Sequence, residues 1–188
     1  TNAKIVLYAR DGRNRINKNS DRIEIIDGDF KDKTNLLKAM KDVDYVYLND
    51  VNSNAATSNV VEAALQSGVK KLIAASILGI YDEVGGAFGE WNAMMVGKPG
   101  TDRHKKSAEI IETSNLDYTI LRLTWLYNQN GNERYWLTQK GEPFFGAQVT
   151  RQAVARLIVD IIQNPSRYVK TSLGVSEPNT DFSKPSFY

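Results

Sequence analysis

The stretch KLIAAS, from Lys71 to Ser76, decides the fold because its apolar residues follow one another without alternation and end at a hydroxyl. A strand of this kind is buried on both faces, as in parallel sheets that helices cover. Four similar runs flank it in the sequence: Ile5–Ala9, Ile23–Ile26, Tyr45–Asn49 and Tyr118–Leu123. The pattern therefore predicts a parallel sheet built from these runs.

Helical spacing of apolar residues separates the predicted strands. Helices are predicted around residues 36–40 and at 54–66, 103–112 and 151–162, the last with Thr150 as its N-cap. Strands that alternate with helices predict an α/β fold of the Rossmann type, a doubly wound parallel sheet with helices on both faces. In such folds, ligands bind at the carboxyl ends of the strands.

The other segments are expected to be less regular. We predict a long glycine-rich loop after Ser76 and an irregular strap over Glu177–Tyr188. One NAD(P)-binding domain is expected over residues 1–188, with its substrate-side elements in about 77–102 and 124–188. Arg122 lies inside an apolar run, so it needs a partner if it is buried, and its role is expected to be structural.

Composition excludes several classes of function. The chain has 188 residues, with 24 basic and 22 acidic side chains, and this near balance argues against nucleic acid as the main partner. It has no cysteine and one histidine, so a disulfide is excluded and a zinc site is not expected. No apolar run approaches the ~20 residues of a membrane span, and the first ten residues lack a signal-peptide pattern. We therefore expect a cytoplasmic protein without a membrane partner.

Four segments carry a resemblance to a known family. They are IEIIDGDFKD (23–32), KKLIAASILGIYDE (70–83), SNLDYTILRLTWLY (114–127) and GEPFFGAQVTRQAVARLIVDII (141–162). In this order they resemble the NmrA-like, atypical branch of the short-chain dehydrogenase/reductase superfamily. The third segment is similar to the family's run SGLDYTILRP, with Leu123 at the usual proline. The resemblance implies an NAD(P)-binding Rossmann domain.

The same resemblance implies a segment that this chain lacks. Family members open with a strand, a Gly-x-x-Gly-x-x-Gly loop and a helix before the strand that Ile5–Ala9 matches. That first strand is central in the strand order 3-2-1-4-5, and its absence would leave buried strand edges unpaired. We expect roughly 25–30 residues, the size of one βα unit, to precede Thr1 in the natural protein.

The adenosine end of a dinucleotide would meet the end of the first predicted strand. Arg10 follows that strand, where an arginine favours the 2′-phosphate of NADP and an acid favours NAD. Arg13 and Arg15 strengthen the positive field, whereas Asp11 weakens it. A solvated basic turn is the alternative. The charge pattern favours NADP over NAD.

Other strand ends supply further candidates for cofactor binding. Asp29 and Phe30 stand where related proteins contact the adenine, although Asp29 is equally suited to be the N-cap of a helix over 31–40. Asn49 and Ser76 each end a strand, and both would face the nicotinamide side of the crevice.

The catalytic pattern of well-studied superfamily members is incomplete. In those enzymes, a hydroxyl near the place of Ser76 holds the substrate carbonyl, and the next helix supplies a tyrosine and, four residues later, a lysine. Lys105 or Lys106 can take the place of the lysine, but Thr101 or Asp102 stands where the tyrosine belongs. The departure puts carbonyl reduction by that mechanism in doubt.

Candidates for the proton donor and the substrate pocket complete the set. His104 lies on the same predicted helix and is a candidate acid, with a solvated helix position as the alternative. Tyr81, Trp91 and Asn92 lie in the predicted loop after Ser76 and either line the substrate pocket or pack the loop down. Arg151 opens a helix that approaches the substrate side in the family.

Two functions follow as hypotheses. The first is an NADP-dependent oxidoreductase that reduces a small carbonyl or quinone by direct hydride transfer. The alternative is a non-catalytic NAD(P)-binding redox sensor of the NmrA type, whose partner is a regulatory protein or a second copy of the chain. A sugar-nucleotide epimerase is disfavoured because those enzymes carry a larger substrate domain.

Overall fold

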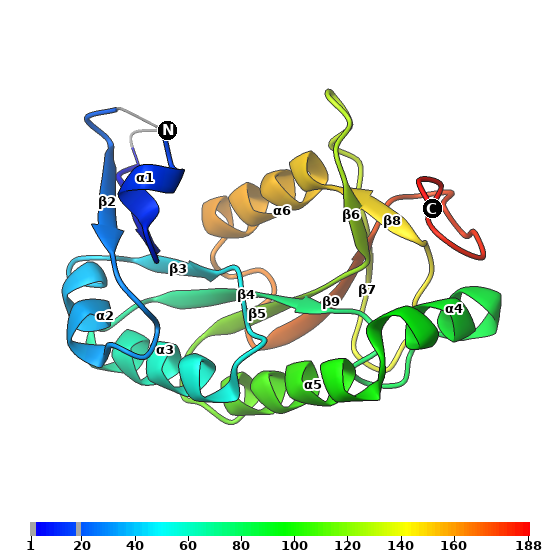
Figure 1. Ribbon diagram of the computed structural model, residues 1–188, viewed down its shortest axis with the longest axis horizontal. Helices are drawn as coiled ribbons and strands as arrows, with labels where there is room; N and C mark the ends of the chain where they lie inside the picture. The colour runs from blue at the N-terminus through cyan, green and yellow to red at the C-terminus, as the bar shows by residue number, and fades with distance from the viewer. Residues whose placement is uncertain (1–2, 18–19) are drawn as a thin grey trace.

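A computed structural model describes residues 3–17 and 20–188 of the protein (Figure 1). Its strands are β1 (Ile5–Ala9), β2 (Ile23–Asp27), β3 (Tyr45–Leu48), β4 (Lys71–Ile77), β5 (Tyr118–Leu123), β6 (Trp125–Tyr127), β7 (Trp136–Thr138), β8 (Gln148–Thr150) and β9 (Thr171–Ser176). Its helices are α1 (Gly12–Arg15), α2 (Lys33–Ala39), α3 (Asn54–Gln66), α4 (Gly86–Val96), α5 (Lys98–Glu112) and α6 (Arg151–Gln163). Within the described ranges, no helix is long and apolar enough to span a membrane.

The strands form one five-stranded sheet and two pairs. The large sheet has the order β3-β4-β5-β9-β7, parallel from β3 to β9, with β7 antiparallel at its edge. Strands β1 and β2 form a parallel pair, and so do β6 and β8. Among the described strands, no ladder joins β1 to β3. The segment expected between them lies outside this sequence, so its existence stays a prediction.

Helices cover both faces of the sheet, as the α/β prediction requires. Figure 1 shows α3 and α5 on one side of the sheet and α6 on the other. In β4, Leu72 and Ala74 pack in the core cluster that contains residues of α3 and α5, whereas Ile73 and Ala75 pack with residues of α6. Successive strand residues point to opposite faces, so an unbroken apolar run is what a strand between two helical layers needs. The Rossmann-type fold is confirmed.

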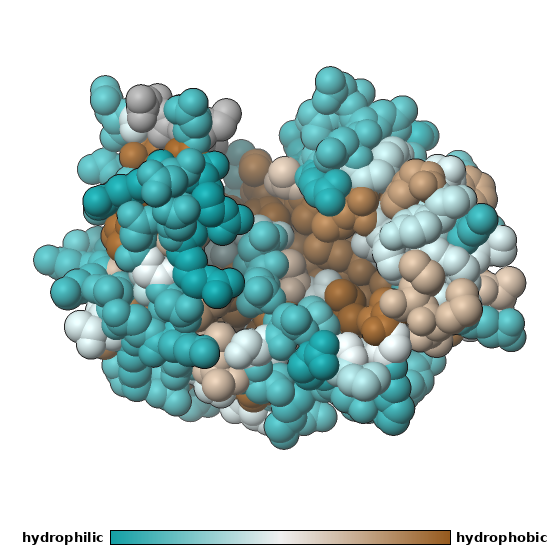
Figure 2. Space-filling model, in the orientation of Figure 1, coloured by the Kyte–Doolittle hydropathy of each residue, from teal (hydrophilic) through white to brown (hydrophobic). Residues whose placement is uncertain are grey.

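The surface of the molecule has a hollow between two of its parts. Figure 2 shows a hollow between the part formed by β1 and α1 and the part formed by α6 and β6. Hydrophobic side chains form its floor, whereas hydrophilic side chains cover the surfaces around β1, β2 and α1.

Several predicted boundaries hold, and one cap was wrong. Helix α3 and strand β5 have the predicted bounds, and Thr150 caps α6 by accepting from the Ala153 N–H at 3.0 Å. Asp29 is not the N-cap of α2. That cap is Asp32, which accepts from the Asn35 N–H at 3.0 Å, because the helix begins only at Lys33.

The prediction of one long glycine-rich loop after Ser76 was wrong, because helix α4 lies in this stretch. Two of its glycines cap helix α4. Gly85 is the N-cap, and Gly97, with a φ of 72°, is the C-cap. At Gly89, a Cβ atom would collide with the backbone of Val84, so only glycine lets the helix pack there. Trp91 and Asn92 therefore lie on a helix. Residues 177–188 form no helix or strand, which confirms the predicted strap.

A buried ion pair ties the loop after β4 to the sheet. Arg122 is 0% exposed, and its Nη1 lies 2.6 Å from Oε1 of Glu83, which is also buried. Its Nη2 donates to the carbonyl oxygen of Gln139 at 3.0 Å, beyond β7. Glu83 also accepts from the N–H groups of Gly79 and Tyr81, at 3.1 and 2.9 Å. Arg122 thus has the partner that its burial requires.

Removing the carboxylate should test how far the fold depends on this pair. Glu83→Ala leaves the Arg122 guanidinium buried without a counter-ion, so we expect the free energy of unfolding to fall by about 3–5 kcal/mol. The matched control is Lys98→Ala, which removes an exposed pair with Asp102 and should cost less than about 0.5 kcal/mol. Urea unfolding followed by circular dichroism measures both variants. Equal losses in the two would contradict the structural role of Glu83.

Candidate functional site

The candidate site lies at the carboxyl ends of β4 and β5. Ser76 and Arg122 are Cα partners in these parallel strands, so their side chains point to the same face, the one covered by α3 and α5. Thr124 comes two residues after Arg122, and its N–H still bonds the Val175 carbonyl oxygen of β9. The alternation therefore places the Thr124 hydroxyl on the face of Ser76.

Four buried polar atoms of this region have no hydrogen-bond partner in the described structure. They are Oγ of Ser76, Oγ1 of Thr124, Nδ1 of His104 and Nε of Arg122. Ser76 and Thr124 are each only 4% exposed. Buried polar atoms are nearly always paired, so unpaired ones at the ligand-binding edge of the fold indicate groups that a ligand satisfies. The sequence did not single out Thr124; its position directly after an apolar strand was the available signal.

His104 lies on the side of α5 that packs against the protein. It stands four residues before Ala108, which is buried with Ile111 in the core beneath β4 and β5. Burial lowers the pKa of His104, and the charge of Arg103 lowers it further, whereas the carboxylate of Asp50 opposes the shift. The imidazole is therefore neutral at pH 7.

The predicted catalytic lysines lie elsewhere on α5. Lys105 and Lys106 are both exposed to solvent. Lys106 pairs with Glu109 at 3.1 Å, and Asp102, at one of the two places for the missing tyrosine, pairs with Lys98 at 3.1 Å. Only His104 of the three predicted catalytic residues on this helix reaches the packed side.

The predicted contacts for adenosine gather at the ends of β1 and β2. The side chain of Arg10 is 81% exposed, and its Nε lies 3.9 Å from Oδ2 of Asp29. Phe30 stacks on Tyr8, with ring centroids 6.0 Å apart and an interplanar angle of 14°. Asn49, at the end of β3, is exposed and accepts from the Tyr47 hydroxyl at 3.0 Å. The structure thus brings Arg10, Asp29 and Phe30 together.

Trp91 and Asn92 join aromatic residues from other segments. Asn92 is buried, and its Oδ1 accepts from the indole N–H of Trp125 at 2.9 Å. The Trp91 and Trp125 rings lie 4.9 Å apart between centroids, and Tyr188 of the strap contacts both. We call Trp91, Trp125 and Tyr188 the aromatic triad.

Tyr81 and Arg151 are placed apart from the triad. The Tyr81 hydroxyl donates to Oε1 of Glu112 at 2.6 Å, in the last residue of α5. Glu112 lies eight residues beyond His104, which is about 12 Å along a helix axis. Burial, with the hydrogen bond to Glu112, raises the pKa of Tyr81 strongly. Arg151 is exposed at the start of α6, where its Nη1 donates to Oδ1 of Asn128 at 3.2 Å.

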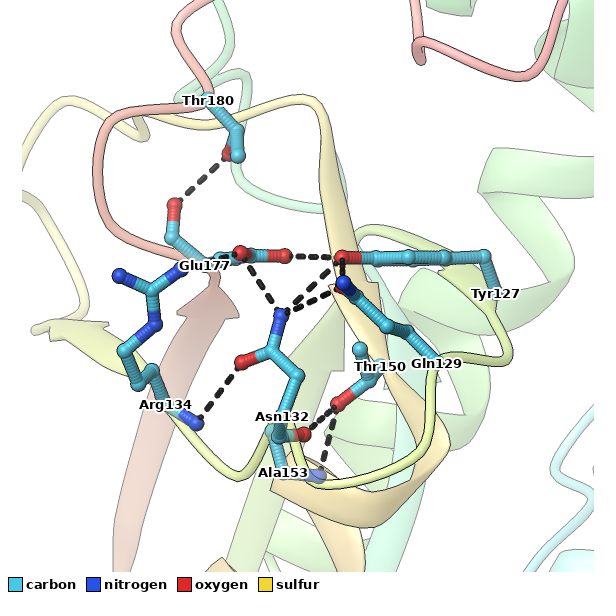
Figure 3. A network of polar contacts seen from close by, with 8 residues as sticks. All are labelled: Tyr127, Gln129, Asn132, Arg134, Thr150, Ala153, Glu177 and Thr180. Atoms are coloured by element: carbon cyan, nitrogen blue, oxygen red, sulfur yellow. Dashed lines mark hydrogen bonds and ion pairs between the residues drawn. The ribbon is translucent and has the colours of Figure 1, made fainter.

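A polar network joins the ends of β6, β8 and β9 (Figure 3). Glu177 is buried, and it accepts from the Tyr127 hydroxyl at 2.6 Å and from Nδ2 of Asn132 at 2.9 Å. Its Oε1 also lies 3.1 Å from the guanidinium of Arg134. Burial raises the pKa of Tyr127, and the hydrogen bond to Glu177 adds to this. Sequence reasoning missed the network because its members come from distant segments, and none belongs to a motif.

The pKa of His104 can be measured without ambiguity, because the chain has only one histidine. We expect NMR titration of its ring protons to give a pKa below 6.5. The unfolded chain takes up this proton near pH 6.5, but the folded chain resists it. The contribution to stability is therefore complete above about pH 6.5 and declines as the pH falls toward the folded-state pKa.

The variant His104→Gln isolates this effect, because its side chain stays neutral at every pH. Its free energy of unfolding should fall less than that of the unaltered protein between about pH 6.5 and 5. A measured pKa at or above 6.5 would show that the imidazole is solvated or paired.

Comparisons with known proteins agree with the Rossmann-type fold. A family model described as NAD(P)H-binding matches residues 1–165. A short-chain dehydrogenase/reductase from Veillonella parvula DSM 2008, solved in complex with NADP, is 32% identical with a TM-score of 0.93, over 97% of this chain and 87% of that one. A Rossmann-fold NAD(P)-binding family protein from Shigella flexneri is also 32% identical, with a TM-score of 0.78, over 97% and 85% of the two chains.

A more distant structure shares the fold alone. ChuY, an anaerobillin reductase from Escherichia coli O157:H7, is 18% identical with a TM-score of 0.71, over 94% of this chain and 85% of that one. A search of the curated proteins gave no match. The family match and the two relatives at 32% identity show that this chain belongs to the NAD(P)H-binding family of Rossmann-fold proteins, within the short-chain dehydrogenase/reductase group.

Proposed function

We propose that the protein is an NADP-dependent oxidoreductase that reduces a small carbonyl compound or quinone by hydride transfer. The observation that carries the proposal is the pair of buried, unpaired hydroxyls of Ser76 and Thr124 at the carboxyl edge of the sheet. Ligands of open α/β folds bind at this edge. The substrate-side elements are then the segments 77–102 and 124–188, which hold α4, β6 and the strap.

The residues of the chain have separate tasks in this reaction. When bound, the reduced nicotinamide supplies the hydride. Ser76 and Thr124 donate hydrogen bonds to the substrate oxygen that gains negative charge. In a carbonyl compound this is the oxygen of the carbon that accepts the hydride, and in a quinone it is the oxygen that does not accept it. Such donors act strongly when they are buried and already oriented. One proton from water then completes the alcohol or hydroquinone. It arrives directly or is relayed by the neutral imidazole of His104, which gives the proton of one ring nitrogen and takes one from water at the other.

The choice of NADP rests on Arg10. Its guanidinium is largely exposed, and its only ion pair among the described residues is a long one with Asp29. A guanidinium in this state is free to bind a phosphate through two parallel hydrogen bonds. Arg15 donates to the Arg10 carbonyl oxygen at 3.4 Å, so a second positive charge stays near this turn.

The variant Arg10→Ala tests the choice of cofactor. Loss of a phosphate contact should weaken NADPH binding by about 10-fold and leave NADH binding unchanged. Lys41→Ala, an exposed lysine that follows α2, serves as the charge-matched control. Titration followed by nicotinamide fluorescence measures both affinities. A parallel loss for NADH and NADPH in Arg10→Ala would argue against phosphate recognition by this residue.

A redox sensor without turnover is the second candidate. One observation favours it: the structure leaves Lys105 and Lys106 in solvent, and neither Thr101 nor Asp102 is a tyrosine. In a sensor, cofactor binding would change the affinity for a regulatory protein or a second copy of the chain. The full-length protein would then bind NADPH but fail to oxidise it with any of a broad panel of quinones and aldehydes.

Substitution of the two hydroxyls tests the enzymatic proposal. Ser76→Ala and Thr124→Val should each lower kcat/KM about 100-fold, as expected for the loss of one donor to a developing oxyanion. NADPH affinity should stay unchanged in both. Thr113→Ala, which removes an exposed hydroxyl near the end of α5, is the control. Activity close to that of the unaltered protein in both hydroxyl variants would rule out this site as the reacting one.

A further inference from the structure

Short stretches of chain connect the aromatic triad to the two hydroxyls. Leu78 follows Ser76 by two residues, which is about 7 Å along an extended chain, and it packs in one cluster with Trp91 and Trp125. Trp125 also follows Thr124 immediately. The triad is therefore a group of flat apolar surfaces that begins within two residues of each hydroxyl-bearing residue, through Leu78 and Trp125.

The three rings form a closed arrangement. Tyr188 meets the Trp91 ring at a centroid distance of 5.2 Å and an interplanar angle of 68°, and the Trp125 ring at 5.2 Å and 81°. These are edge-to-face contacts within the usual range for aromatic pairs. The Tyr188 ring thus fills the space against both indoles that another flat ring would use.

The members of the triad differ in how firmly they are held. Trp125 is fixed by its hydrogen bond to the buried Asn92, and Trp91 lies on helix α4. Tyr188, by contrast, lies on the strap and is 54% exposed. The strap is tied nearby by the Ser186 N–H, which donates to Oε1 of Gln148 at 2.8 Å. The Trp91 and Trp125 rings are therefore held in place, whereas the Tyr188 ring lies on a segment without regular secondary structure.

We infer that Tyr188 determines which substrates fit, by restricting the site to acceptors with a single small ring. This inference rests on the proposed function. A one-ring quinone can reach the hydroxyls without displacing Tyr188. A fused, multi-ring quinone needs the space that the Tyr188 ring occupies, although the two indoles would offer it good stacking surfaces.

The test compares a one-ring with a three-ring acceptor. Tyr188→Ala should raise the ratio of kcat/KM for phenanthrenequinone to that for duroquinone by about 10-fold or more, the scale on which pocket space discriminates substrates. Phe182→Ala is the matched control, because Phe182 lies on the same strap, is 43% exposed and makes none of the triad's ring contacts. A ratio that stays unchanged or falls in Tyr188→Ala would overturn the inference.

A binding measurement separates this inference from the proposed function. In a Trp136→Phe background, Trp91 and Trp125 are the two tryptophans left, so quenching of selectively excited tryptophan emission by phenanthrenequinone without NADPH reports on the triad itself. Tyr188→Ala should lower the Kd for this quinone about 10-fold, whereas Phe182→Ala should not. If no variant turns over either quinone, the proposed function fails, and this Kd decides the inference alone. An unchanged Kd would then overturn it.

Discussion

The buried ion pair between Arg122 and Glu83 is the constraint on which the site depends. A guanidinium without solvent contact must have its charge compensated inside the protein, and Glu83 is the carboxylate that does so. Glu83 in turn holds the N–H groups of Gly79 and Tyr81, which fixes the path of the chain after β4. Leu78, just before this segment, packs in one cluster with Trp91 and Trp125. Arg122 is the Cα partner of Ser76, so the residue that anchors this ion pair lies directly beside a residue of the candidate site.

Two groups of buried polar residues near the substrate side differ in how their hydrogen bonds are met. Around Glu177, every polar side chain drawn in Figure 3 bonds another member of the network. This group therefore has a structural role, because it links the end of β6 to the end of β9. At Ser76 and Thr124, the hydroxyls are just as buried but bond nothing in the described structure. Leaving such atoms unpaired costs free energy. A ligand that forms hydrogen bonds with them removes this cost, and the recovered free energy contributes to its binding.

The sequence predicts the sheet well, because burial on two faces leaves a local signal. KLIAAS and YTILRL are apolar at consecutive positions, and α3 and β5 have the predicted bounds. The errors arise where a residue type has two uses. The glycines after Ser76 suggested a loop, but they end a helix and allow its close packing. Asp29 and Asp32 are both suited to capping, and Asp32 is the cap because α2 begins at Lys33. The triad could not be predicted, since Trp91, Trp125 and Tyr188 meet only in the folded chain.

The direction of the Ser76 hydroxyl follows from packing alone. Leu72 and Ala74 belong to the core under α3 and α5, and Ile73 and Ala75 to the core under α6. With a period of two, the next residue on the first face is residue 76, so a shift of one position in register would turn its hydroxyl to the other layer. The same period sends Arg122, and then Thr124, to this face from β5. The two hydroxyls therefore point to the same face at one edge of the sheet, because the apolar residues before them pack in alternation into the two core layers. The packing of the core thus sets the direction of both side chains.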